Sequence, residues 1–188
     1  RRSSDLVSKS TQSLIGNSSI LSKVYFPRLV IPLTPVLSGL VDFLISLSIV
    51  FLMMIYYSIM PSFNILWLPI LVLMMVLTSS GIGMWLSALA LQYRDVRHAV
   101  SFIIQILMYA APVVWPISLL IDRIGLNLTY IYAVYPMVGV IEGFRAALLG
   151  HDLMPYNIIL ISAFSSLIIF ISGMFYFNSK QKFFADIA

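Results

Sequence analysis

Long apolar runs separated by short polar segments dominate the chain. Four runs reach the length of about 20 apolar residues that an α-helix needs to cross the hydrocarbon region of a bilayer. The four runs are Val36–Tyr57, Ile65–Leu91, Ala99 to about Leu119, and Ile158–Phe177. The pattern therefore predicts four membrane-spanning helices.

A fifth apolar run, Leu128–Leu149, differs from these because it contains Pro136, Glu142 and Arg145. Proline ends a helix, and two charges are costly when they face lipid. Opposite charges three residues apart can, however, pair on one helix face. We interpret the run as a re-entrant pair of short helices, which is tolerated where protein or a water-filled cavity surrounds it.

Composition agrees with a membrane protein. The 188 residues are 61% hydrophobic and 10% charged, whereas a soluble domain carries about 25% charged residues. We expect one all-α transmembrane helical bundle over residues 1–188, with four full spans and a re-entrant helical pair. The chain has no cysteine, which excludes disulfides, thiolate metal sites and cysteine nucleophiles.

The basic residues orient the predicted spans. Most of the eleven lie on one side of the predicted membrane, namely Arg1, Arg2, Lys9, Lys23, Arg28, Arg94, Arg97, Lys180 and Lys182. The positive-inside rule places this side, with both termini, in the cytoplasm, and four spans return the chain to it. The re-entrant region, about 120–155, then lies on the outer side. Because the charges are scattered between apolar runs, they form no basic face for nucleic acid.

Residues 1–35 form the first predicted cytoplasmic or interfacial segment. Near its end, Tyr25 and Phe26 lie between two cations, Lys23 and Arg28, and Pro27 stops a helix there. Such a cluster is typical of a juxtamembrane anchor, in which cations meet headgroups and aromatic rings lie in the interface. A docking surface for a cytoplasmic partner is the alternative.

A short charged loop joins the second and third predicted spans. It includes the side chains Tyr93, Arg94, Asp95 and Arg97. A short rigid loop transmits displacement to the helices that it joins, as a mechanical coupling element would. Its charges are equally explained by their contribution to membrane topology.

Other polar and aromatic positions allow two interpretations each. Asp42 in the first span is interpreted as half of a structural pair with a cation, and a proton relay is the alternative. Small residues around Gly81 in the second span indicate close helix packing. Outer-side aromatic residues fit an interfacial belt or a sugar-binding mouth: Trp115, Tyr130, Tyr132, Tyr135 and Tyr156. No catalytic, nucleotide-binding or metal-binding motif is present in the sequence.

Several strings in this chain resemble the type-2 ABC transporter permeases that export lipid-linked O-antigen, capsule or teichoic-acid polymers. These strings are Leu21–Arg28, Leu33–Phe43, Tyr93–Val96, Pro112–Val113, Gly139–Arg145 and Phe184–Asp186. They occur in the family's order and spacing. The resemblance covers the later part of such a permease, so we expect upstream sequence to be missing.

The resemblance implies a transport subunit of the inner (plasma) membrane, with no cofactor of its own and not an enzyme. Two permeases would pair with two ABC ATPase subunits, which would carry ATP and Mg²⁺ and dock on Lys23–Arg28 and Tyr93–His98. A lipid-linked glycan would pass through a channel at the homodimer interface, surrounded by membrane lipids.

The resemblance also implies an outer gate formed by the re-entrant helices. Its expected residues are Pro112, Trp115, Pro136, Glu142 and Arg145. A permease for a drug or small lipid is the alternative within the same architecture. A membrane-embedded glycosyl-lipid enzyme is a third hypothesis, which would need clustered acids or histidines at one membrane face.

Overall fold

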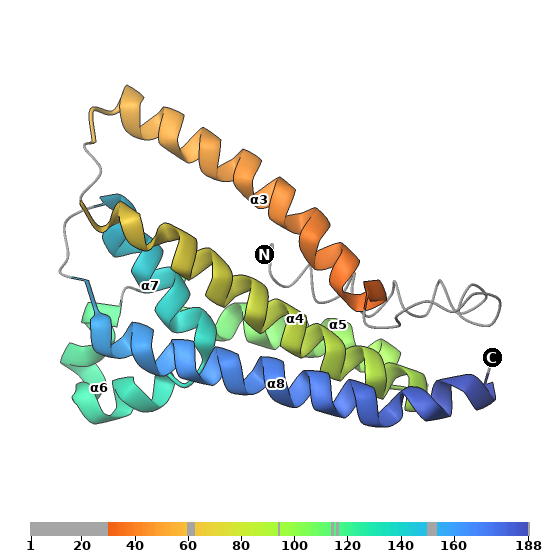
Figure 1. The fold of residues 1–188 in the computed structure, drawn as a ribbon. Coiled ribbons are helices and arrows are strands. Elements are labelled where there is room, and N and C mark those ends of the chain that lie inside the picture. Colours follow the sequence, from red (N-terminus) through yellow and green to blue (C-terminus); the bar gives the residue numbers. More distant parts are fainter. Residues whose placement is uncertain are drawn as a thin grey trace. The chain divides into compact units, whose positions relative to one another are not determined.

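A computed structural model describes residues 30–59, 63–93, 95–113, 115, 117–149 and 154–187, and over these residues the chain is helical without strands. In chain order the elements are α3 (Val30–Tyr56), a 3₁₀ turn η1 (Phe63–Trp67), α4 (Leu68–Gln92), α5 (Val96–Ala110), α6 (Ile117–Tyr132), α7 (Pro136–Leu149) and α8 (Tyr156–Ile187) (Figure 1). The predicted all-α class is confirmed for the described part of the chain.

Three described helical stretches are long and apolar enough to cross a membrane. They are Leu33–Tyr56, Phe63–Ala90 and Tyr156–Lys180. These stretches coincide with the first, second and fourth predicted spans, because long uninterrupted apolar runs can satisfy their backbone groups in lipid as helices.

The third predicted span is wrong as a single helix from Ala99 to Leu119. Helix α5 ends at Ala110, and α6 begins at Ile117. Pro112 explains the break, because proline lacks an N–H donor and disfavours a helical conformation in the residue before it. The 15 residues of α5 extend about 22 Å, which is shorter than the hydrocarbon region of a bilayer.

The predicted break inside Leu128–Leu149 is confirmed. Helix α6 ends at Tyr132, a turn follows, and Pro136 is the first residue of α7, the helix position that tolerates proline best. A second interruption lies within α6, where Gly125 has φ of 80°, a conformation that glycine adopts without steric penalty.

The contacts divide the chain into two compact units, and α3, α4, α5 and α8 contribute residues to both. Among the described residues, the first unit contains the start of α3 and the ranges 76–108 and 168–187. The second unit contains the ranges 43–75 and 109–167. Each unit is described by itself below.

In the first unit, α4 and α8 meet backbone to backbone at Gly81 and Gly173. A Cβ atom added to Gly173 would lie 2.5 Å from the Gly81 carbonyl oxygen, and one added to Gly81 would lie 2.8 Å from backbone atoms of Ile169. The predicted close packing at Gly81 is therefore confirmed. Small residues permit this approach, which strengthens dispersion and interhelical hydrogen bonds within a membrane.

Aromatic side chains continue the contact between α4 and α8 in the first unit. The rings of Trp85 and Tyr176 stack with centroids 4.6 Å apart. The Trp85 indole N–H donates to Ser172 Oγ at 3.2 Å, and the Tyr176 hydroxyl donates to Gln92 Oε1 at 3.2 Å. These polar contacts fix the register in which the two helices pack.

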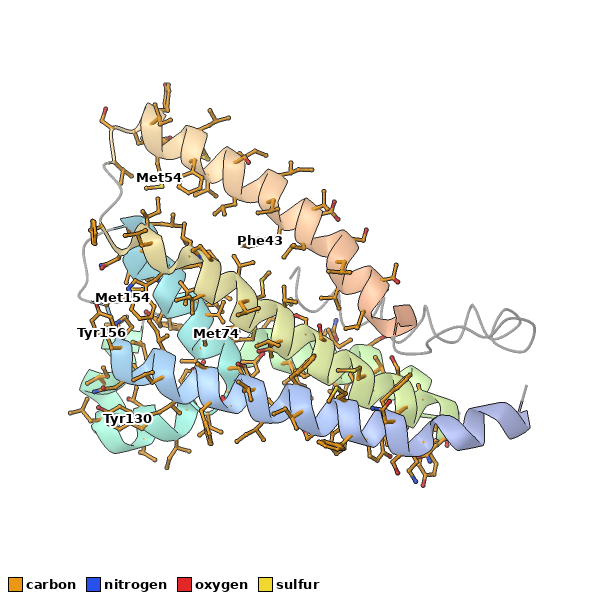
Figure 2. All side chains as sticks on the ribbon, viewed as in Figure 1. Phe43, Met54, Met74, Tyr130, Met154 and Tyr156 are labelled. Carbon is orange, nitrogen blue, oxygen red and sulfur yellow. The ribbon has the colours of Figure 1, made fainter. Side chains whose placement is uncertain are left out.

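The second unit has a methionine-rich apolar cluster. The cluster includes Met74 and Met75 of α4, Met137 of α7, and Met154, which precedes α8; Figure 2 labels Met74 and Met154. At the edge of this cluster Trp67 and Tyr156 form an edge-to-face pair, with centroids 5.6 Å apart. Flexible thioethers fill irregular gaps between helices, so α7 packs here despite its small residues.

We expect Gly173→Leu to prevent the α4–α8 contact. A side chain at this position meets the Gly81 backbone rather than a movable side chain, so the loss of stability should reach at least about 3 kcal/mol. Thermal unfolding in detergent, followed by tryptophan fluorescence, measures it. Ala99→Leu on an exposed position of α5 is the size-matched control and should change stability little. Equal unfolding temperatures for the two variants would contradict the contact.

Candidate functional site

Glu142 and Arg145 form an ion pair on α7. Nη1 of Arg145 donates to Oε1 of Glu142, one helical turn away, and the two side chains are 19% and 7% exposed for arginine and glutamate respectively. The predicted pairing of these two opposite charges on one helix face is thus present. Burial makes such a pair depend on further hydrogen bonds that satisfy its remaining polar atoms.

Glu142 also contacts the first residue of α6, the preceding helix. Its Oε1 accepts a hydrogen bond at 3.0 Å from the backbone N–H of Ile117, the first residue of α6. The first N–H groups of a helix have no partner within the helix, and they form the positive end of its dipole. A carboxylate from another helix therefore caps α6.

Arg145 donates hydrogen bonds to carbonyl groups that follow α5. Its Nη2 donates to the carbonyl oxygens of Pro112 at 3.1 Å and Val113 at 3.4 Å. The planar guanidinium can reach several acceptors at once. One ion pair on α7 thereby holds both the turn after α5 and the start of α6.

Tyr132, the last residue of α6, supports the same turn. Its hydroxyl donates to the carbonyl oxygen of Ala110, where α5 ends. This hydrogen bond joins the end of α6 to the end of α5.

Ser162 of α8 caps the start of α7. Its hydroxyl accepts the Gly139 N–H at 3.1 Å and donates to the Ala133 carbonyl oxygen at 2.8 Å. Ser162 is fully buried, and a Cβ atom on Gly139 would lie 2.5 Å from its side chain. The turn between α6 and α7 is therefore fastened to α8.

Two further residues of α7 contact α4 and α3. A Cβ atom on Gly143 would lie 2.6 Å from Leu71 of α4. The Phe144 ring meets Phe43 of α3 edge to face, with centroids 5.7 Å apart. Within seven residues, Gly139 to Arg145, α7 contacts α3, α4, α6, α8 and the turn after α5.

The predicted gate residues are partly brought together. Glu142, Arg145 and Pro112 share one hydrogen-bond network. Pro136 is buried at the start of α7. Trp115 lies in the turn that Arg145 holds, but its side chain is 63% exposed.

The predicted coupling residues are mostly beyond what the structure describes. Lys23, Tyr25, Phe26, Arg28 and Arg94 lie outside the described residues, and so does the side chain of Arg97. Tyr93 and Asp95 are exposed at the end of α4 and before α5. Asp42 is exposed on α3.

The outer aromatic residues divide into two groups. Trp115 and Tyr156 are at least half exposed, as a belt or a sugar-binding surface requires. Tyr130, Tyr132 and Tyr135 instead pack against the apolar cluster around Ile117 and Ile158. Among the described residues no group of acids and histidines could hold a metal ion.

Sequence reasoning missed Ser162, and it included Gly139, Gly143 and Phe43 only within the family-like strings, without a role for each. A usable signal existed for the two glycines, because small residues four apart on a helix permit close packing in membranes. Ser162 is one of several serines in α8, and nothing in its local sequence distinguishes it.

We expect Glu142→Ala to destabilise the protein by about 3–5 kcal/mol, because it leaves the Arg145 charge buried without its partner. Glu142→Gln should cost less, since its amide oxygen can still accept the Ile117 N–H. Thermal unfolding in detergent measures both, with Asp95→Asn on an exposed carboxylate as the control. If Glu142→Ala behaved like the control, the capping role would be wrong.

A second prediction concerns two buried serines on α8. Ser162→Ala should cost about 1–3 kcal/mol, because the Gly139 N–H and the Ala133 carbonyl lose a partner. Ser166 is equally buried, but its hydroxyl donates to Ala163 of its own helix, so Ser166→Ala should cost less than about 1 kcal/mol. The same unfolding measurement compares them, and equal losses would argue against the α7 cap.

Known proteins are similar to most of this chain. The ABC-2 type transporter family matches residues 7–149. An O-antigen export system permease protein RfbA of Klebsiella pneumoniae is 30% identical over 93% of this chain and 66% of its own length. The permease of the same name from Myxococcus xanthus is 26% identical over 89% of this chain and 64% of its own length.

The match spans just under two thirds of the length of these relatives. The family match covers the turn after α5, the capped start of α6 and the whole of α7. Glu142, Arg145 and Tyr132 therefore lie in the part of the chain that the family model matches, and Ser162 lies beyond it. This chain belongs to the ABC-2 type transporter family of membrane proteins.

Proposed function

We propose that this chain is the membrane-spanning part of a permease that exports a lipid-linked polysaccharide from the cytoplasm to the outer face of the inner membrane. The observation that carries this proposal is the similarity, over 93% of the chain, to a permease named for O-antigen export. The permease itself performs no chemistry on the polymer in this proposal.

The proposed topology has four crossings and cytoplasmic termini. The stretches Leu33–Tyr56, Phe63–Ala90 and Tyr156–Lys180 provide three, and α5 together with the chain that follows it provides the fourth. Because α5 is short, the chain turns at Pro112 before it leaves the membrane. The ion pair on α7 supports this, since it satisfies backbone groups of that turn where water is scarce.

Helices α6 and α7 form the proposed re-entrant outer gate. Its parts are Pro112 and Trp115 in the turn after α5, Pro136 at the start of α7, and the Glu142–Arg145 pair. In the proposed closed state the pair binds the turn to α7 and closes this side of the pathway. Opening moves the turn, α6 and α7 away from the axis of the channel.

ATP hydrolysis takes place on a separate ABC ATPase subunit, which holds ATP and Mg²⁺. Two permeases and two ATPases assemble, and the polymer passes along the interface between the permeases. The ATPase docks on two cytoplasmic surfaces, one formed by Lys23, Tyr25, Phe26 and Arg28 and the other by Tyr93, Arg94, Asp95 and Arg97. Closure of the ATPase pair pushes on these surfaces and tilts the attached helices.

Charge reversal in the second docking surface tests the proposal. In the full-length permease, Arg94→Glu combined with Asp95→Arg should weaken pull-down of the ATPase encoded beside it by at least about tenfold, because like charges then face each other across the interface. Arg123→Glu, on the predicted outer side, is the matched control and should bind as the unaltered permease does.

The substrate class is tested in the same complex. In liposomes, ATP hydrolysis should rise when a lipid-linked glycan is present. Stimulation by a small lipid or drug instead would reassign the substrate. Binding that survives the charge reversal would remove the docking role of this loop, and a permease that captures no ATPase would overturn the exporter proposal.

A further inference from the structure

Phe43 is a residue of α3 that reaches α7. Its ring meets the Phe144 ring edge to face at 5.7 Å, with an angle of 72° between the ring planes. Both rings pack against the methionine-rich cluster of the second unit, and Figure 2 shows Phe43 on the helix α3 together with Met74 and Met154 of that cluster. The next residues of α3, Leu44 and Ile45, are exposed.

Phe144 lies within the segment that holds the candidate gate. It directly precedes Arg145 and follows Glu142 by two residues, and these two side chains bind the turn after α5 and the start of α6. A rigid α-helix transmits any displacement at Phe144 to both neighbours. The contact with Phe43 therefore acts on the ion pair through the backbone of α7.

The contacts of α7 differ in how easily they can change. Gly139 approaches Ser162 closely and is hydrogen-bonded to it, and Gly143 receives Leu71 at a distance that leaves no room for a side chain. The Phe43–Phe144 contact involves only the two rings, with neither a hydrogen bond between them nor a close approach at a glycine. An edge-to-face pair can slide or separate while the other contacts hold α7 to α4 and α8.

Helix α3 connects this contact to the cytoplasmic side of the proposed topology. It is continuous from Val30 to Tyr56, and the first proposed docking surface, ending at Arg28, directly precedes it. Among the three long apolar stretches, the one in α3 has the smallest share of buried residues. Fewer packed neighbours oppose its movement.

We infer that Phe43 is a positioning residue of the outer gate: its contact with Phe144 transmits the movement of α3 to α7, and so to the turn that Glu142 and Arg145 hold. The inference rests on the proposed exporter function and adds to it the residue pair through which the cytoplasmic push reaches the gate. Phe43 touches neither ATP nor polymer in this role.

A cysteine reporter measures the movement of the gate directly. The 188 residues contain no cysteine, and the Val113 side chain is exposed in the turn that Arg145 holds. The full-length permease, without other reactive cysteines and carrying Val113→Cys, is reconstituted in liposomes with its ATPase. A membrane-impermeant maleimide then labels the outer side, with and without Mg-ATP and vanadate on the ATPase side.

The ratio of the two labelling rates is the readout. With Phe43 in place, trapping the nucleotide should change the labelling rate. Phe43→Ala should bring this change down by about two- to tenfold, the factor that corresponds to an aromatic pair. Phe43→Leu keeps most of the volume and should give an intermediate value. Phe43→Ala with Phe144→Ala should be no worse than either change alone, because both remove one contact.

Phe164→Ala is the matched control, since it removes the same side chain from an exposed position of α8. It should leave the ratio as it is. All variants are compared in vesicles with equal amounts of bound ATPase, which separates loss of transmission from loss of assembly.

Two results would count against the inference in different ways. The first is an unaltered complex that binds its ATPase and responds to nucleotide, while Phe43→Ala and Phe43→Leu respond as strongly as the unaltered complex does. This result would overturn the role of Phe43 and leave the exporter proposal intact. A full-length permease that neither binds an ATPase nor responds to nucleotide would overturn the proposed function itself.

Discussion

Broken helices inside an apolar protein create backbone groups that neither lipid nor the helix can satisfy. The second unit of this chain contains such breaks after Ala110, at Gly125 and before Pro136. Side chains from other helices bind the exposed groups at two of them: Glu142, Arg145 and Tyr132 after α5, and Ser162 before α7. The irregular backbone can exist there because these four side chains replace water.

Many of the contacts that hold these helices together come from a short segment of α7. Its glycines bring α8 and Leu71 of α4 close, its charged pair holds the neighbouring turn, and Phe144 meets α3. Close packing and hydrogen bonding replace the hydrophobic effect as the source of association between helices in a membrane. A short helix rich in glycine is thus better anchored here than its length suggests.

The sequence predicted the parts of this fold that depend on local pattern. Long apolar runs gave three helices, and Pro136 gave the break before α7. Pro112 was visible in the sequence, yet the third predicted span was extended past it because the residues on both sides are apolar. The Glu142–Arg145 pair was predictable because it lies three residues apart on one helix. The partners of Phe43 and Ser162 come from distant positions in the chain, about which single-residue patterns carry no information.

The pairing of Glu142 with Arg145 has an electrical consequence. In the proposed re-entrant position, α7 lies within the field across the membrane, where one elementary charge moved through 100 mV changes its energy by about 2.3 kcal/mol. One anion and one cation that move together carry no net charge through that field. Displacement of the proposed gate would therefore require no electrical work from this pair, and through it the membrane potential would favour neither the open nor the closed position.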